Sequence, residues 1–215
     1  APKLTQELGR LLAHLVREIR DLDRLVDADA LFGLRHLLSG ALWRAASLAI
    51  APLAASIAVD PEVLLGSASP PARAVLLLLS GFVVLWVAGF DVIYALQDLE
   101  YDTRVGLSSV PARLGWRGAI WVSRWLHAGA AVLLAASAIA GPMVARGVQG
   151  VPVGGGHTGL GAGYAAGVGA VIGLLVVEHA VLARRGRSGL GMVFFTYNGV
   201  ISVVLGCIGV VDLLI

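Results

Sequence analysis

Carboxylates gather in one short segment of the chain, directly after an apolar stretch. Asp98 and Asp102 are four residues apart. On a continuing helix, such residues lie on one face with Cβ atoms about 5–6 Å apart. Two carboxylates so close repel each other unless a cation lies between them. Oxygen ligands of this kind suit Mg²⁺, which commonly bridges carboxylates to substrate phosphates, so the spacing predicts a magnesium site.

Other ionisable residues surround this pair. Asp91 lies within the preceding apolar stretch, where a carboxylate is costly, and this predicts a functional role for it. Arg104 and Arg113 follow the pair and offer guanidinium groups that can hold phosphate oxygens. Carboxylates, arginines and an apolar setting together indicate a lipid substrate that carries a diphosphate. The competing interpretation is a solvated helix face, which is the common setting of an Asp pair at this spacing.

The elements that position these residues are expected to be membrane helices. The chain has 215 residues, of which 58% are hydrophobic and 14% charged, whereas soluble domains are nearer half and a quarter. A spanning helix needs about 20 mostly apolar residues. Five stretches qualify, at roughly 37–59, 74–97, 118–141, 159–183 and 189–211. The predicted fold is therefore all-α, a polytopic transmembrane helix bundle forming one domain over residues 35–215.

Basic residues orient this predicted bundle. They cluster in the second and fourth connections, between the apolar stretches, and in the segment before the first stretch. An alternating topology puts these three groups on one side, which the positive-inside rule assigns to the cytoplasm. We therefore predict an inner, cytoplasmic-membrane protein whose 97–117 loop faces the cytoplasm. The net charge of +2 is small, and no nucleic-acid partner is expected.

Residues 1–34 differ from the rest of the chain. Apolar residues recur at steps of three and four between residues 4 and 26, among many charged residues. This periodicity predicts an amphipathic helix. Such a helix lies on the membrane surface or pairs with another helix.

Several polar residues fall inside the predicted spans. Arg44 either pairs with an acceptor carboxylate or with Asp91, or it extends toward the membrane surface or faces the bundle. Asn198 is expected to bond another helix, with substrate contact as the alternative. Glu178 and His179 are predicted to make a structural hydrogen bond between helices. His127 has no partner at ligand spacing and is assigned no role, and with one cysteine no Cys/His metal cluster is predicted.

The carboxylate segment resembles a known motif. Residues Tyr94 to Asp102, with the pattern Tyr-x-x-x-Asp-x-x-x-Asp, are similar to the second Asp-rich motif of the UbiA superfamily of aromatic prenyltransferases. The following 106–115 segment and the 194–202 segment, preceded by Glu178 and His179, are also similar to that family. The resemblance covers about residues 36–215 and is strongest to its 4-hydroxybenzoate polyprenyltransferase-like branch.

This resemblance implies Mg²⁺-dependent transfer of a polyprenyl group from polyprenyl diphosphate to an aromatic acid in quinone biosynthesis, for ubiquinone or menaquinone. The acceptor is 4-hydroxybenzoate or a related ring, such as a futalosine-type or naphthoate ring. Asp98 and Asp102 would hold the metal. Tyr94 or Tyr197 would face the prenyl cation, with a position at the membrane interface or in the core as the alternative for either tyrosine. Family members have nine spans and two Asp-rich motifs, so the chain would correspond to the last five spans. The alternative is a non-catalytic membrane subunit or a truncated remnant of such an enzyme.

Overall fold

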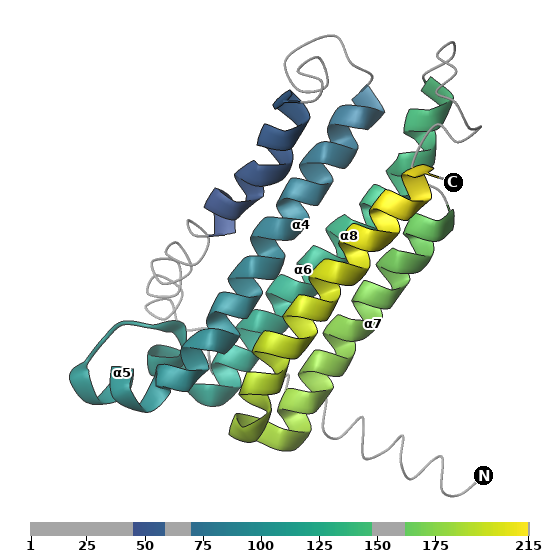
Figure 1. Ribbon diagram of the computed structural model, residues 1–215. Coiled ribbons are helices and arrows are strands. Elements are labelled where there is room, and N and C mark those ends of the chain that lie inside the picture. The colour runs from purple at the N-terminus through teal and green to yellow at the C-terminus, as the bar shows by residue number, and fades with distance from the viewer. Residues whose placement is uncertain (1–44, 59–69, 148–161, 215) are drawn as a thin grey trace, which may run out of the picture.

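The computed structural model describes residues 45–58, 70–147 and 162–214, and all regular elements in these ranges are helical. Four long helices run side by side in Figure 1. They are α4 (Pro70–Ala95), α6 (Val110–Gly147), α7 (Ala162–Arg185) and α8 (Asn198–Leu214). The predicted all-α bundle is confirmed for this part of the chain.

Short helical segments join the long helices. Between α4 and α6 lie η1 (Leu96–Asp98) and α5 (Leu99–Val105). Between α7 and α8 lie η2 (Gly186–Gly189) and the π-helix η3 (Met192–Tyr197). A further helix, Ala45–Ala58, lies beside α4 (Figure 1), where Ala45 packs with Ala88.

Three of the helices are long and apolar enough to cross a membrane. These stretches are Ala72–Val105, Val110–Ala140 and Ala162–Gly189, and they correspond to the second, third and fourth predicted spans. The first and fifth predicted spans correspond to the shorter apolar helices Ala45–Ala58 and Met192–Ile208. Part of the first predicted span and all of the predicted amphipathic helix over residues 1–34 lie outside the described residues.

Glycines bring α4 and α6 close together. A Cβ atom on Gly81 would lie 3.0 Å from Leu133 Cδ1, and one on Gly129 would lie 2.9 Å from Leu85 Cδ1. Larger residues at these positions would push the helices apart, and small residues have this role at many membrane helix interfaces. On α7, a Cβ atom on Gly167 would lie 2.7 Å from Ile208 Cγ2 of α8, whereas one on Gly169 would have no atom within 4 Å.

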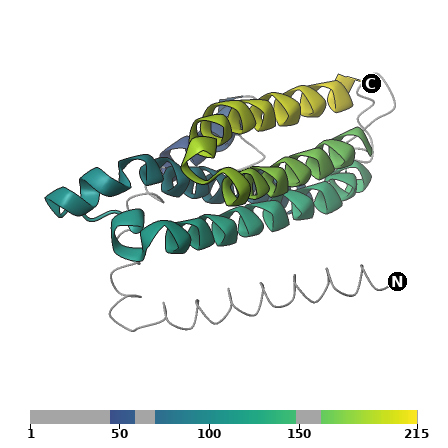
Figure 2. The same ribbon diagram turned by 90° about the horizontal axis from the view of Figure 1, so that it is seen from below.

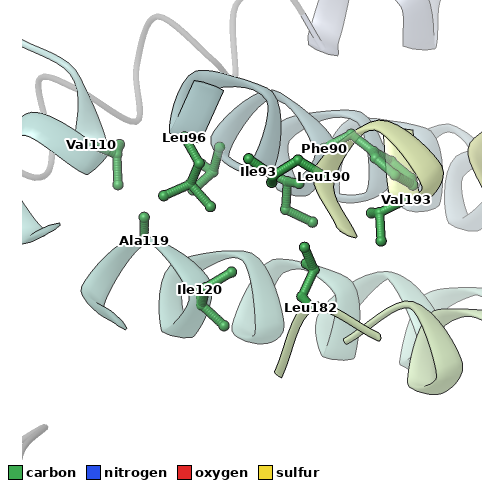
Figure 3. Packing of buried hydrophobic residues seen from close by; sticks show 10 residues of the cluster. Phe90, Ile93, Leu96, Val110, Ala119, Ile120, Leu182, Leu190 and Val193 are labelled. Carbon is green, nitrogen blue, oxygen red and sulfur yellow. The ribbon is translucent and has the colours of Figure 1, made fainter. Parts of the chain in front are cut away.

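An apolar cluster fixes the end of the bundle that carries the carboxylate segment (Figure 3). It draws side chains from α4, η1, α6, α7, η3 and the residues just before η3. Its labelled members are Phe90, Ile93, Leu96, Val110, Ala119, Ile120, Leu182, Leu190 and Val193. Leu96 is 2% exposed, so it anchors η1 just before Asp98. The carboxylate segment therefore begins on a rigid base.

Candidate functional site

The two predicted metal-ligating carboxylates lie where α4 gives way to α5. The α-helix of α4 ends at Ala95, and Asp98 is the last residue of the 3-10 turn η1 and the N-cap of α5. Asp102 lies one turn further, within α5. The chain thus leaves the α4 axis before the carboxylates, and α5 projects beyond the end of the bundle (Figure 2). The predicted continuing helix is interrupted, although Asp98 and Asp102 still bracket one helical turn.

Both carboxylates are available to a ligand from outside the chain. Asp98 is exposed and Asp102 is half-buried. Within the described ranges, neither side chain forms an ion pair or a hydrogen bond. Oxygen donors with no protein partner, one turn apart at a solvent-facing helix end, fit a Mg²⁺ ion that keeps part of its water shell.

Their neighbour Glu100 behaves differently. Its carboxylate accepts a short hydrogen bond from Arg187 of η2. Because α5 carries exposed charged residues, we place it outside the membrane, and there the bond and charge of Arg187 lower the pKa of Glu100. This contact ties the α4–α6 connection to the α7–α8 connection at one end of the bundle. The two basic loops therefore share a side, as the alternating topology predicted, while the compartment that they face stays a prediction.

The chain turns back sharply between α5 and α6. Gly106 ends α5 in the left-handed conformation, with φ 70°, and the Leu107 N–H donates to the Asp102 carbonyl at 2.9 Å. Ser109 caps α6, because its Oγ accepts the Ala112 N–H at 3.2 Å. These two caps fix the ends of the turn, so the loop after Asp102 has a defined path.

The predicted diphosphate-binding arginines flank this turn. Arg104 and Arg113 are both exposed, and Arg113 Nη2 donates to Ser108 Oγ at 3.4 Å. Gly115 follows with φ 68° and ψ −179°, a conformation that is essentially restricted to glycine, and it kinks α6. The short helical piece that bears Arg113 is thereby separated from the membrane-spanning part of α6.

Aromatic rings connect the carboxylate segment to the start of α8. The Tyr94 ring lies 4.7 Å from the Phe194 ring, centroid to centroid, although the residues are a hundred positions apart. Phe194 belongs to the π-helix η3, and such segments often occur at functional sites. Tyr94 precedes Asp98 by one turn, and Asn198 follows Phe194 by one turn.

The other predicted site residues are Asp91, Asn198 and Arg44. Asp91 lies two turns before Asp98 on α4 and is half-buried. Asn198, at the start of α8, is also half-buried. Arg44 lies outside the described residues. The structure therefore brings Tyr94 next to the η3 and α8 segment, and it leaves Arg44 undescribed.

A second polar group is buried inside the bundle, and the sequence predicted part of it. Glu178 and His179 were expected to bond between helices, and His179 Nε2 lies 3.4 Å from Ser123 Oγ of α6. His127 of α6 has its Nδ1 atom 3.5 Å from Oε1 of Glu178 on α7, and His179 Nδ1 lies 3.9 Å from the same oxygen. The expectation that His127 has no partner at ligand spacing was therefore wrong. The sequence signal was the carboxylate of Glu178 within an apolar run. The 51-residue separation from His127 hides the partner, which only helix packing reveals.

Comparison with known proteins identifies one family. The model of the UbiA prenyltransferase family matches residues 31–200. This range includes the whole carboxylate segment, the arginines after it and the aromatic pair. No curated protein and no solved structure shows a significant match to the chain.

Proposed function

Since the chain belongs to the UbiA prenyltransferase family, with a match over more than half of its length, we propose that it transfers a polyprenyl group from polyprenyl diphosphate to an aromatic acid. Its apolar helices make it an integral membrane protein. One observation carries the proposal: Asp98 and Asp102 have no side-chain partner within the described ranges and stand one helical turn apart at the end of a membrane helix. This arrangement supports a diphosphate-binding site.

Asp98 and Asp102 would hold Mg²⁺, which neutralises the diphosphate and makes it a better leaving group. Arg104 and Arg113 follow along the same loop and are exposed. Their guanidinium groups donate hydrogen bonds to the diphosphate oxygens, and these bonds strengthen as negative charge develops on the leaving group. When the substrate binds, Arg113 would give up its hydrogen bond to Ser108 and donate to a diphosphate oxygen instead.

The prenyl carbon becomes an allylic cation as the C–O bond breaks and its electron pair leaves with the diphosphate. Aromatic faces attract cations, and the Tyr94 and Phe194 rings lie one helical turn from Asp98 and from Asn198. We assign to this aromatic pair the stabilisation of the prenyl cation. A helix bundle also keeps water away from the cation, which would otherwise be hydrolysed.

The electron-rich ring of the acceptor attacks the cation and forms the new carbon–carbon bond. The ring then loses a proton and regains its aromaticity. Asp91 lies two turns deeper in the bundle than Asp98 and is our candidate to orient the acceptor hydroxyl or to take this proton. Asn198 and Arg44 are the candidates for contact with the acceptor. Arg44 would bind the carboxylate of the acceptor.

We further propose that the acceptor is 4-hydroxybenzoate or a related ring of quinone biosynthesis, and that the 97–117 loop faces the cytoplasm. The competing proposal is a non-catalytic membrane subunit, or a remnant that needs a second Asp-rich motif from elsewhere. Residues 4–26 are the candidate helix for binding a partner in that case.

The test is Mg²⁺-dependent prenyl transfer in membranes that contain the full-length protein, with Asp98→Asn compared to Glu100→Gln. Both variants remove one carboxylate charge near the start of α5, but Glu100 binds Arg187 rather than a metal. Asp98→Asn is expected to lose transfer, and Glu100→Gln is expected to retain it. Wild-type turnover by Asp98→Asn would overturn the metal assignment. Absence of turnover in the wild type, with all acceptors, would favour the non-catalytic subunit.

A further inference from the structure

A polar cluster lies inside the bundle, away from the diphosphate loop. His127 comes from α6, and Glu178 and His179 come from α7. Their side chains are 3%, 0% and 12% exposed, respectively. Glu178 lies seven residues before Arg185, the end of α7, which corresponds to roughly 10 Å at 1.5 Å per residue. The cluster is therefore separate from the exposed carboxylates of α5.

Hydrogen bonding fixes which nitrogen of His127 carries a proton. Its Nε2 atom lies 3.2 Å from the carbonyl oxygen of Trp86, which can only accept. Nε2 is therefore the donor, and in a neutral imidazole the other nitrogen, Nδ1, is then an acceptor. This Nδ1 faces Glu178 Oε1 at 3.5 Å, and a carboxylate oxygen is also an acceptor. Two acceptors point at each other.

No group in the described part of the chain relieves this arrangement. His127 Nδ1 and both carboxylate oxygens of Glu178 are buried and lack a hydrogen-bond partner there. A buried carboxylate without a partner costs several kcal/mol. A cation bound between the two opposed acceptors would satisfy both of them.

We propose that His127, Glu178 and His179 form a transition-metal site, with Zn²⁺ as the ion that fits best. Two imidazoles and one carboxylate are a common zinc ligand set, with metal–ligand distances of about 2.0–2.2 Å. In a tetrahedral site such distances put ligand atoms about 3.4 Å apart. The observed separations from Glu178 Oε1 are 3.5 and 3.9 Å, and all three ligand atoms lie within 4.8 Å of one another. Mg²⁺ fits poorly, because it prefers oxygen ligands and retains waters.

The surroundings of His127 match this assignment, and those of His179 allow it after a change of tautomer. A metal-binding histidine usually donates its other N–H to a carbonyl, a carboxylate or water, which orients the ring. The Trp86 carbonyl has this role for His127. For His179, Nε2 lies 3.4 Å from the Ser123 hydroxyl, while Nδ1 lies 3.0 Å from the Leu175 carbonyl. The Leu175 carbonyl can only accept, so Nδ1 of His179 carries the proton in the described arrangement. Metal binding through Nδ1 would replace this hydrogen bond and move the proton to Nε2, which would then donate to Ser123. The ion would link α6 to α7.

The experiment uses untagged full-length protein in detergent micelles, stripped with a chelator, equilibrated with Zn²⁺ and then dialysed against metal-free buffer. Zinc per chain is measured by elemental mass spectrometry, and Co²⁺ replaces Zn²⁺ as a spectroscopic probe. The wild type is expected to retain one zinc per chain and to give the intense visible absorption of tetrahedral Co²⁺. Because this measurement uses the wild type, it does not depend on whether a variant folds.

Variants locate the ion. Glu178→Gln and His127→Gln are expected to weaken zinc retention at least about tenfold. Asp98→Asn removes a proposed ligand of the diphosphate site and is expected to retain zinc. The Asp98→Asn control separates this inference from the proposed function. A wild type without retained zinc would overturn the site and would favour a proton on Glu178 that bonds to His127. Zinc retention unchanged in both cluster variants would also overturn it.

Discussion

Gly89 of α4 provides the space that His127 occupies. A Cβ atom on Gly89 would lie 2.2 Å from Cδ2 and 2.3 Å from Nε2 of His127, which is far closer than van der Waals contact. The His127 ring is confined, because the Phe90 ring centroid lies 5.0 Å away and the His179 centroid 5.2 Å away. Gly89→Ala therefore forces the ring to move and breaks its bond to the Trp86 carbonyl.

The size of the effect follows from three contributions. Overpacking a well-packed core costs about 1–3 kcal/mol. An interhelical hydrogen bond in a membrane protein contributes about 0.6 kcal/mol. Alanine gains about 1 kcal/mol over glycine in helix propensity. The net expectation is a loss of about 0.6–2.6 kcal/mol in the free energy of unfolding.

The assay is reversible unfolding of the full-length protein in mixed micelles, with a matched control and a double variant. Gly173→Ala is the control, because no atom lies within 4 Å of the Cβ that it adds, and it should not destabilise the protein. In Gly89→Ala/His127→Ala the clash is absent, so the two changes should couple favourably by about 1–3 kcal/mol. If Gly89→Ala matched Gly173→Ala and showed no coupling to His127, the described packing of α4 on α6 would be refuted.

Three further changes test the site. The hydrogen bond and ion pair with Arg187 hold the pKa of Glu100 below its ordinary value of 4.5, so the contact is complete above pH 4.5 and is lost as the pH falls through the lowered pKa. Hydrogen exchange of α5 should therefore rise below pH 4.5, and Arg187→Ala should raise this exchange at neutral pH. Phe194→Leu should remove one aromatic face from the proposed cation site, where a cation–π contact contributes at least about 0.5 kcal/mol, and should lower the kcat of prenyl transfer at least about twofold; unchanged kcat would count against the aromatic assignment. Gly115→Ala should cost about 1–3 kcal/mol in the free energy of unfolding, because of its φ of 68°; an unchanged unfolding midpoint would argue against the kink.

Much of the fold follows from local composition. Long apolar runs predicted the helices that contain Ala72–Val105, Val110–Ala140 and Ala162–Gly189, because lipid requires every backbone group to be bonded within the segment. Interruptions in those helices were less visible. The 3-10 turn before Asp98 and the π-helix around Phe194 arise from packing between helices, which local periodicity does not report.

In the candidate site, too, some features follow from the local sequence and others depend on helix packing. The loop that carries Asp98 and Asp102 was predicted from spacing, because four residues make about one helical turn. The contacts that assemble it were not. Tyr94 meets Phe194, and His127 meets Glu178, across separations that only tertiary structure closes. The sequence indicates which residues can take part in chemistry, and helix packing determines which of them are in contact.

The magnesium diphosphate site is tested by equilibrium binding of a labelled polyprenyl diphosphate to the full-length protein in lipid nanodiscs, with and without Mg²⁺. We expect that binding requires Mg²⁺ and weakens at least about tenfold, or about 1.4 kcal/mol, in the Asp98→Asn/Asp102→Asn variant. Binding of equal strength without Mg²⁺, and in that variant, would contradict the assignment of the α5 carboxylates as a magnesium diphosphate site.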